Sequence, residues 1–263
     1  GVCIESGGQP VFNGNKIKQC AAAGVLVREG GLGRVEDNDI EDNQGAGIEI
    51  TTRANPVIER NRICKGQGMG VFVHLMGEGQ IVDNDVGNNA GSGLAIGKGA
   101  KPFVSQNNIH DGRSCGIEIL PGAGGIVKGN DVHHNYECAV LITGGDDVLL
   151  SENTFHEGAT QGVLLKGESV TETVIVEGNT FSTNAAAAIE VSHGANPTIR
   201  NNKIHNNLNR GVWVHSKGNG RFEDNEIANN QSNGIQIETE SNPTMINNSV
   251  HHGRTNGVLV VNG

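Results

Sequence analysis

Short stretches in which apolar and polar positions alternate recur along the whole chain. Examples are residues 24–27 (GVLV), 47–50 (GIEI) and 211–214 (GVWV), where two inward apolar residues flank one outward residue. Alternation with a period of two is typical of a β-strand that buries one face. Gly, Asn, Asp and Pro interrupt the stretches every few residues, which leaves no room for a helix. The pattern predicts many short strands.

These stretches follow one another at a fixed interval. Each begins with Gly or Ala, and successive starts are 23 residues apart, except for 26 between Gly162 and Ala188. The starts are Gly1, Gly24, Gly47, Gly70, Gly93, Gly116, Ala139, Gly162, Ala188, Gly211, Gly234 and Gly257. A repeat of short strands predicts a solenoid whose turns stack on one another. We expect the glycine at this position to adopt a positive φ at a tight corner.

An asparagine recurs in the same phase. The series is Asn15, Asn38, Asn61, Asn84, Asn107, Asn130, Asn153, Asn179, Asn202, Asn225 and Asn248. In stacked coils these side chains would lie above one another and bond through their amides as a ladder. The sequence therefore predicts an all-β fold, a single-stranded right-handed parallel β-helix of about eleven coils. At ~4.8 Å per coil, one domain over residues 1–263 would be on the order of 55 Å long.

A longer period lies over the first. Corners with Pro, such as Asn55-Pro56 and Asn242-Pro243, alternate with Gly-rich corners such as Gly31-Leu32-Gly33, so the full unit is a pair of coils. The three extra residues fall within residues 168–173. Insertions map to loops, so we expect this segment to protrude as a lip.

The fragments NKIHNN, EDNEI and NGIQIETESNPT, with their alternating corners, resemble the β-helix region of F-box-only proteins. They are also similar to the wider group of carbohydrate-binding and sugar hydrolase (CASH) repeats. The resemblance covers essentially the whole chain. It implies a β-helix that, in the F-box proteins, is thought to present substrate to a ubiquitin ligase.

Composition narrows the classes of protein. The net charge of −10 argues against nucleic acid as a partner, and no apolar run reaches the ~18 residues of a membrane span. The five Cys form no CxxC pair, so we expect free thiols, including the stacked Cys115 and Cys138. Free thiols and the absence of a signal peptide favour a cytoplasmic or nuclear location. No cofactor is expected. Both ends stop within a strand, so we expect a longer parent chain or self-association.

The outward positions of the repeated strand are the candidate binding surface. Trp213 is the only Trp and points outward, and a Trp beside polar groups suits a sugar ring or a peptide. The candidate binding residues are Trp213, His215, Glu190, Gln236, Glu238, Phe72, His74, Glu49 and Arg28. An exposed apolar residue on a solenoid is also common without any function.

No convergent catalytic set is found, so the catalytic residues are unknown. Asp146-Asp147 and Ser192-His193-Gly194 resemble polygalacturonase motifs, but they are two coils apart and fall in corner loops. His110, His133 and His156 stack on consecutive coils and are weak candidates for metal ligands. Because no Cys or carboxylate completes a compact set, no metal site is predicted.

Two functions follow from these observations. The first is a non-enzymatic scaffold that binds a protein or peptide along the Trp213 face. The alternative is a carbohydrate-active protein, a polysaccharide lyase, C5-epimerase or sugar-binding module, whose partner on the same face is a polysaccharide.

Overall fold

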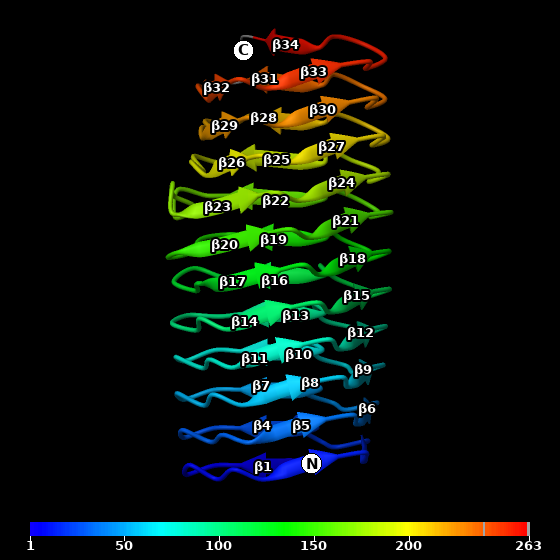
Figure 1. The fold of residues 1–263 in the computed structure, drawn as a ribbon, viewed down its shortest axis with the longest axis vertical. Coiled ribbons are helices and arrows are strands. Elements are labelled where there is room, and N and C mark those ends of the chain that lie inside the picture. The colour runs from blue at the N-terminus through cyan, green and yellow to red at the C-terminus, as the bar shows by residue number, and fades with distance from the viewer. Residues whose placement is uncertain (239, 262–263) are drawn as a thin grey trace.

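The computed structural model describes residues 1–238 and 240–261 and is a right-handed parallel β-helix. Figure 1 shows its coils stacked in one column, with the N-terminus and the C-terminus at opposite ends. Each coil gives one strand to each of three parallel sheets, here named A, B and C, which contain 12, 11 and 11 strands. The predicted fold class is confirmed, and no helix occurs in the described residues.

The strands are three or four residues long. Sheet A consists of β1 (Val2–Ile4), β4 (Val25–Val27), β7 (Ile48–Ile50), β10 (Val71–Val73), β13 (Leu94–Ile96), β16 (Ile117–Ile119), β19 (Val140–Ile142), β22 (Val163–Lys166), β25 (Ile189–Ser192), β28 (Val212–Val214), β31 (Ile235–Glu238) and β34 (Val258–Val261). Sheet B consists of β2 (Val11–Asn13), β5 (Arg34–Glu36), β8 (Val57–Glu59), β11 (Gln80–Val82), β14 (Phe103–Ser105), β17 (Gly125–Lys128), β20 (Val148–Ser151), β23 (Val174–Glu177), β26 (Thr198–Arg200), β29 (Arg221–Glu223) and β32 (Thr244–Ile246). Sheet C consists of β3 (Lys16–Lys18), β6 (Asp39–Glu41), β9 (Arg62–Cys64), β12 (Asp85–Gly87), β15 (Asn108–His110), β18 (Asp131–His133), β21 (Thr154–His156), β24 (Thr180–Ser182), β27 (Lys203–His205), β30 (Glu226–Ala228) and β33 (Ser249–His251).

The register explains the core. Equivalent residues of neighbouring coils pair directly, so that Val25 faces Ile48 and Val27 faces Ile50. All four side chains are fully buried. Because alternate residues of a strand point to opposite faces, the inward positions form continuous aliphatic columns inside the tube. β-branched side chains suit these pleated columns, which replace a core of large aromatic residues.

The predicted asparagine ladder is present. In its central rungs, the Asn84 amide nitrogen donates to Asn107 Oδ1, and the Asn107 amide nitrogen donates to Asn130 Oδ1, each at 2.9 Å. Asn107 Nδ2 also donates to the carbonyls of Ile81 and Ser105 at 2.9 and 3.0 Å. The ladder therefore satisfies backbone groups that would otherwise be buried without a partner.

A second ladder, not recognised in the sequence, follows five residues after the first. Its amides come from Asn43, Asn89, Asn135, Asn184, Asn207 and Asn230. Between them, Gly66, Gly112 and Gly158 have no side-chain amide but donate their backbone N–H to the Oδ1 of Asn89, Asn135 and Asn184, at 3.0, 3.0 and 3.2 Å. A Cβ on Gly112 would lie 2.9 Å from Asn135 Oδ1. Asparagine and glycine therefore alternate in the lower coils.

The glycine that precedes each sheet A strand does not have the expected backbone. Gly70 and its equivalents are absent from the positive-φ residues, so that prediction is wrong. Glycine is needed there because the coils approach closely. A Cβ on Gly70 would lie 2.4 Å from Val86 Cγ1 and 2.5 Å from the carbonyl oxygen of Gly93. The left-handed conformation belongs instead to the residue before each ladder position, as at Gln106 (φ 57°).

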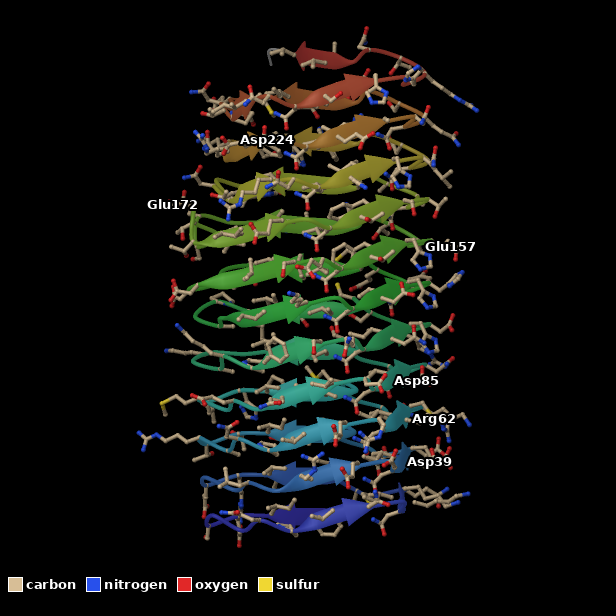
Figure 2. The ribbon with its side chains drawn as sticks, in the orientation of Figure 1. Asp39, Arg62, Asp85, Glu157, Glu172 and Asp224 are labelled. Atoms are coloured by element: carbon tan, nitrogen blue, oxygen red, sulfur yellow. The ribbon has the colours of Figure 1, made fainter. Side chains whose placement is uncertain are left out.

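The three-residue insertion lies between β22 and β23, at the corner that joins sheets A and B. Val170 holds the insertion in place. Its side chain is fully buried, and its backbone forms a parallel β-bridge with Gly145 of the coil below. Glu168 and Glu172 are exposed. Figure 2 places Glu172 on one edge of the column, opposite Glu157 of sheet C. The insertion thus forms a lip over the adjacent coils.

Candidate functional site

The middle residue of the three-residue sheet A strands lies on the outer face of the sheet, although Ala95 of β13 is fully covered there. In β10 and β28, the outer residues Phe72 and Trp213 are half-buried between fully buried valines. Glu190 and Gln236 are less accessible than an open stripe would suggest, because each is only 7% exposed. Polar side chains on this surface therefore contact one another closely.

Trp213, His215 and Glu190 form the centre of the candidate site. The imidazole of His215 stacks on the indole of Trp213, with ring centroids 3.9 Å apart. His215 Nε2 lies 3.1 Å from Glu190 Oε1, and His215 Nδ1 lies 2.9 Å from Ser216 Oγ. Gln161 Nε2 donates to the other Glu190 oxygen at 2.8 Å. With Glu190 ionised, Nε2 of a neutral His215 carries the proton, which leaves Nδ1 as the basic atom.

Three more side chains surround the indole. The Arg210 guanidinium carbon lies 4.7 Å from the centroid of the Trp213 ring, and Arg210 Nε donates to Gln236 Oε1. Trp213 Nε1 donates to Glu238, to which Gln236 also donates at 3.4 Å. Within residues 1–238 and 240–261, no carboxylate forms an ion pair with Arg210. In the described part of the chain, Arg210 is therefore a half-buried cation whose partners are the neutral side chains of Gln236 and Asn209 and which forms no ion pair.

Sequence reasoning missed Arg210. It lies in the turn before β28, outside the strand positions from which the binding surface was predicted. The available signal was its place three residues before the only Trp, since an arginine near an aromatic ring often stacks on it. We name the group of Arg210, Trp213, His215, Glu190, Gln236 and Glu238 the Trp213 cluster.

Phe72, His74 and Glu49 repeat this arrangement six coils lower. The rings of Phe72 and His74 stack with centroids 4.1 Å apart, and His74 Nε2 lies 2.9 Å from Glu49 Oε1. Arg28 is not part of this group, because it donates to Glu5 at 2.7 Å. The lower group has the carboxylate, imidazole and aromatic ring of the Trp213 cluster, but no arginine over its ring is found among the described residues.

A cavity of about 540 Å³ adjoins the Trp213 cluster at the lip. It is lined by Glu168, His193, Gly194, Ser216, Lys217 and Glu240. His193 connects the two regions, since its ring lies edge-on to that of His215 at 6.4 Å. The insertion contributes Glu168, so it deepens the surface beside the candidate site.

The two motifs similar to those of polygalacturonases do not come together. Asp146 and Asp147 are exposed at a corner, where Asp147 forms an ion pair with Lys101 at 3.2 Å. His193 lies by the lip cavity, and its Nδ1 is 3.0 Å from Ser192 Oγ. Asp146-Asp147 and His193-Gly194 fall in corners as expected, whereas Ser192 is the last residue of β25.

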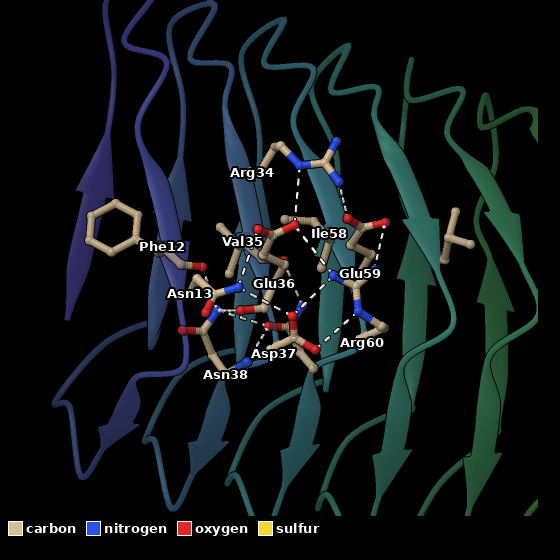
Figure 3. Close-up of polar contacts among 12 residues, drawn as sticks. Phe12, Asn13, Arg34, Val35, Glu36, Asp37, Asn38, Ile58, Glu59 and Arg60 are labelled. Carbon is tan, nitrogen blue, oxygen red and sulfur yellow. Dashed lines mark hydrogen bonds and ion pairs between the residues drawn. The ribbon is translucent and has the colours of Figure 1, made fainter.

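An ion-pair network of two arginines and three carboxylates lies on sheet B and connects neighbouring coils. Figure 3 shows Arg34 and Arg60 between the carboxylates of Glu36, Asp37 and Glu59. The Arg60 guanidinium donates to Asp37 and lowers the pKa of that carboxyl. Two guanidiniums are shared among three carboxylates, so both arginines are fully engaged within the network and neither is left to bind an anionic ligand.

The histidines of sheet C form the predicted column. The rings of His110 and His133 lie 5.3 Å apart, and those of His133 and His156 lie 4.9 Å apart. Each Nε2 meets a side chain of the coil below: Asp85 for His110, Asn108 for His133 and Asp131 for His156. The expectation that no carboxylate completes a compact set is therefore wrong, because Asp131 lies with His133 and His156.

The pKa of His110 is raised above its usual value, whereas the pKa of His133 is lowered. Burial lowers the pKa of His110, but hydrogen bonds to Asp111 and Asp85 raise it by more. Burial lowers the pKa of His133; Asp131 raises it, but burial together with the neighbouring imidazoles keeps it below its usual value. A raised pKa means protonation at a higher pH. In metal-free protein taken from pH 8 to pH 5, NMR of the imidazole protons should show His110 protonating before His133, and the reverse order would contradict this.

Cys115 and Cys138 are free and buried, as expected. Their sulfur atoms lie 3.1 Å apart on consecutive coils. The Cys138 contact and burial raise the pKa of the Cys115 thiol far above its usual value. Cys115 is therefore not a nucleophile in this state, because its thiolate is disfavoured.

Comparison with known proteins identifies one family model. Its description is "Right handed beta helix region", and it matches residues 1–90, 64–199 and 170–263. Among curated proteins, no sequence matches this chain. No helix in the described residues is long and apolar enough to cross a membrane.

Three solved structures illustrate the likeness. A double mutant of the periplasmic alginate epimerase AlgG has a TM-score of 0.74 at 13% identity, over 91% of this chain and 64% of that chain. The A-module of Azotobacter vinelandii mannuronan C-5 epimerase AlgE6 has a TM-score of 0.60 at 15% identity, over 99% and 83%. The catalytic domain of a GH87 alpha-1,3-glucanase in complex with nigerose has a TM-score of 0.52 at 14% identity, over 99% and 63%.

These identities make the likeness one of fold alone. Three AlgG structures match this chain with TM-scores of 0.63 to 0.74. The chain spans only 61% to 64% of the length of those three proteins. What the Trp213 cluster binds must therefore be argued from its own residues.

Proposed function

The chain belongs to the family of right-handed β-helix regions, and on that premise we propose that it is a carbohydrate-active protein that binds an acidic polysaccharide at the Trp213 cluster. The observation that carries the proposal is the Arg210 guanidinium, which lies over the Trp213 ring without a carboxylate partner. A sugar carboxylate would supply that counter-charge through charge-assisted hydrogen bonds. The aromatic ring beside it offers an apolar surface to the sugar.

The chemistry of the neighbouring pair supports a uronic acid as the sugar. The C5 proton of a uronate is α to a carboxyl group, so its removal needs a base and a cation that stabilises the developing negative charge. His215 Nδ1 is the base in this proposal, because Glu190 holds the opposite nitrogen; the Ser216 hydroxyl, 2.9 Å from Nδ1, must turn away when the substrate binds. Arg210 is the cation. Removal of this proton followed by delivery of a proton from water to the opposite face of C5 is epimerisation. Removal of the proton with formation of the C4–C5 double bond and cleavage of the C4–O4 bond, whose leaving oxygen takes up a proton from water, is the lyase reaction.

The fold neighbours favour this function over the protein-binding scaffold. The titles of the structures described above name alginate epimerases, a mannuronan C-5 epimerase and an alpha-1,3-glucanase, and none names an F-box protein. A protein or peptide partner on the same face is the competing proposal, supported by the sequence resemblance alone.

Replacing Trp213 with alanine tests the binding surface. We expect Trp213→Ala to weaken binding of uronate oligosaccharides about tenfold, because it removes the stacking surface and the support for Arg210. Isothermal titration calorimetry with uronate and neutral oligosaccharides measures the change. Phe72→Ala is the matched control, since it removes the equivalent ring where no arginine lies over it, and it should change the affinity less than twofold.

The same measurement separates the two functions. Equal affinity for neutral and acidic oligosaccharides would remove the assigned role of Arg210. If no glycan binds and a protein captured by the wild type is lost with Trp213→Ala, the scaffold function replaces the proposed one.

A further inference from the structure

Sheet C brings three metal-binding side chains together on two neighbouring coils. Asp131 and His133 stand two residues apart in β18 and therefore point to the same outer face. His156 in β21 pairs directly with His133. Potential ligand atoms of Asp131, His133 and His156 all lie within 4.8 Å of one another.

The surrounding contacts hold these side chains in place. His156 Nε2 lies 2.9 Å from Asp131 Oδ1, and His156 Nδ1 lies 3.4 Å from Glu157 Oε2. Glu157 Oε2 also lies 3.1 Å from His134 Nε2, while His134 Nδ1 lies 2.7 Å from His133 Nδ1. These contacts link the five side chains in one continuous series from Asp131 to His133. A carboxylate on the far nitrogen of a histidine is the usual outer partner that orients a metal-binding imidazole.

We propose that Asp131, His133 and His156 form a site for one divalent transition-metal ion, with Zn²⁺ as the best match. Two imidazoles and one carboxylate, with a fourth position open to water, are a ligand set that zinc accepts. Imidazole also binds Cu²⁺ and Ni²⁺, whereas Ca²⁺ and Mg²⁺ prefer sites made of oxygen.

The geometry requires only small rotations. Ligand atoms around tetrahedral zinc lie roughly 3.3 Å apart, given Zn–N distances of about 2.0–2.1 Å. The side chain of Asp131 is 53% exposed and that of His156 is 25% exposed, so both can turn without disturbing the core. The backbones that carry them are fixed by the parallel pairing of β18 with β21.

Equivalent positions elsewhere in the column lack the set. At His205, the place of Asp131 is taken by Lys203, and the neighbouring coils carry Ser182 and Ala228 instead of a second histidine. His205 is thus a histidine of the same phase without metal-binding neighbours. The site lies on sheet C and does not depend on the function proposed for sheet A.

The experiment compares metal binding by matched variants. Protein treated with EDTA is titrated with Zn²⁺ by calorimetry and with Co²⁺ by visible absorption, which reports tetrahedral coordination. We expect one equivalent of Zn²⁺, with the affinity reduced about tenfold or more in His133→Ala, His156→Ala and Asp131→Asn. His205→Ala should bind as the wild type does.

Several results would overturn the proposal. These are no binding above that of a His133→Ala/His156→Ala double variant, binding equally reduced by His205→Ala, and several equivalents bound without response to any variant. Thermal unfolding of each metal-free variant verifies folding, and His156→Gln, which keeps a side chain of similar length, serves as a second variant if His156→Ala unfolds.

Discussion

Asn107→Ala is expected to lower the free energy of unfolding by about 3–5 kcal/mol. The Asn107 amide donates to the carbonyls of Ile81 and Ser105, and its oxygen accepts from the backbone and side chain of Asn84. Alanine leaves these groups buried without partners, and each such group costs about 1–3 kcal/mol. Urea unfolding followed by circular dichroism measures the loss.

The next residue along the chain is the matched control. Asn108 is half-buried and points outward, where its amide nitrogen donates to Asp85 and its oxygen lies next to His133 Nε2, each at 3.0 Å. Water can replace both contacts, so Asn108→Ala should cost less than about 1 kcal/mol. Equal losses in the two variants would mean that the ladder contributes no more to stability than a surface amide.

His215→Ala is expected to reduce turnover of a uronate polysaccharide about 10²- to 10⁴-fold, the usual contribution of a general base. The substitution removes the only imidazole that stacks on Trp213 and bonds to Glu190. Absorbance of unsaturated uronate measures lyase activity, and NMR of the anomeric protons measures epimerisation at C5.

His74→Ala controls for loss of an imidazole–carboxylate pair. His74 bonds to Glu49 and stacks on Phe72 in the same way, six coils away, or about 29 Å at the inter-strand spacing. A short oligosaccharide bound at Trp213 does not reach it, so turnover should stay within twofold. Retained activity in His215→Ala would exclude this residue as the base.

The fold was predictable because its determinants repeat with the coil. Each ladder Asn and each inward Ile or Val recurs after one turn, so one residue type marks one place in space. The second ladder was not recognised because glycines such as Gly66 and Gly112 replace some of its asparagines. These glycines donate their backbone N–H to the asparagine of the next coil, but a glycine in the sequence gives no sign of that contact. The period of this ladder is therefore two coils over part of the chain.

The candidate site was predictable only in part. Trp213, His215 and Glu190 share the strand phase, and the register brings them together as expected. Arg210 and Asp131 were missed for different reasons. Arg210 contacts the indole from a turn, and the strand periodicity does not predict the conformation of a turn. Asp131 contacts His156 because the imidazole is tilted toward the coil below, which the sequence does not indicate.

The direction of the hydrogen bonds in the three sheets has a mechanical consequence. Strands run around the column, so the bonds between coils lie along its length (Figure 1). A force that pulls the two ends apart would act on the hydrogen bonds of the terminal coil first, so the coils would detach one after another. Each rupture would release one repeat of 23 residues, or roughly 75–80 Å of extended chain. The coil with the insertion would release 26 residues and stand out as the one longer step.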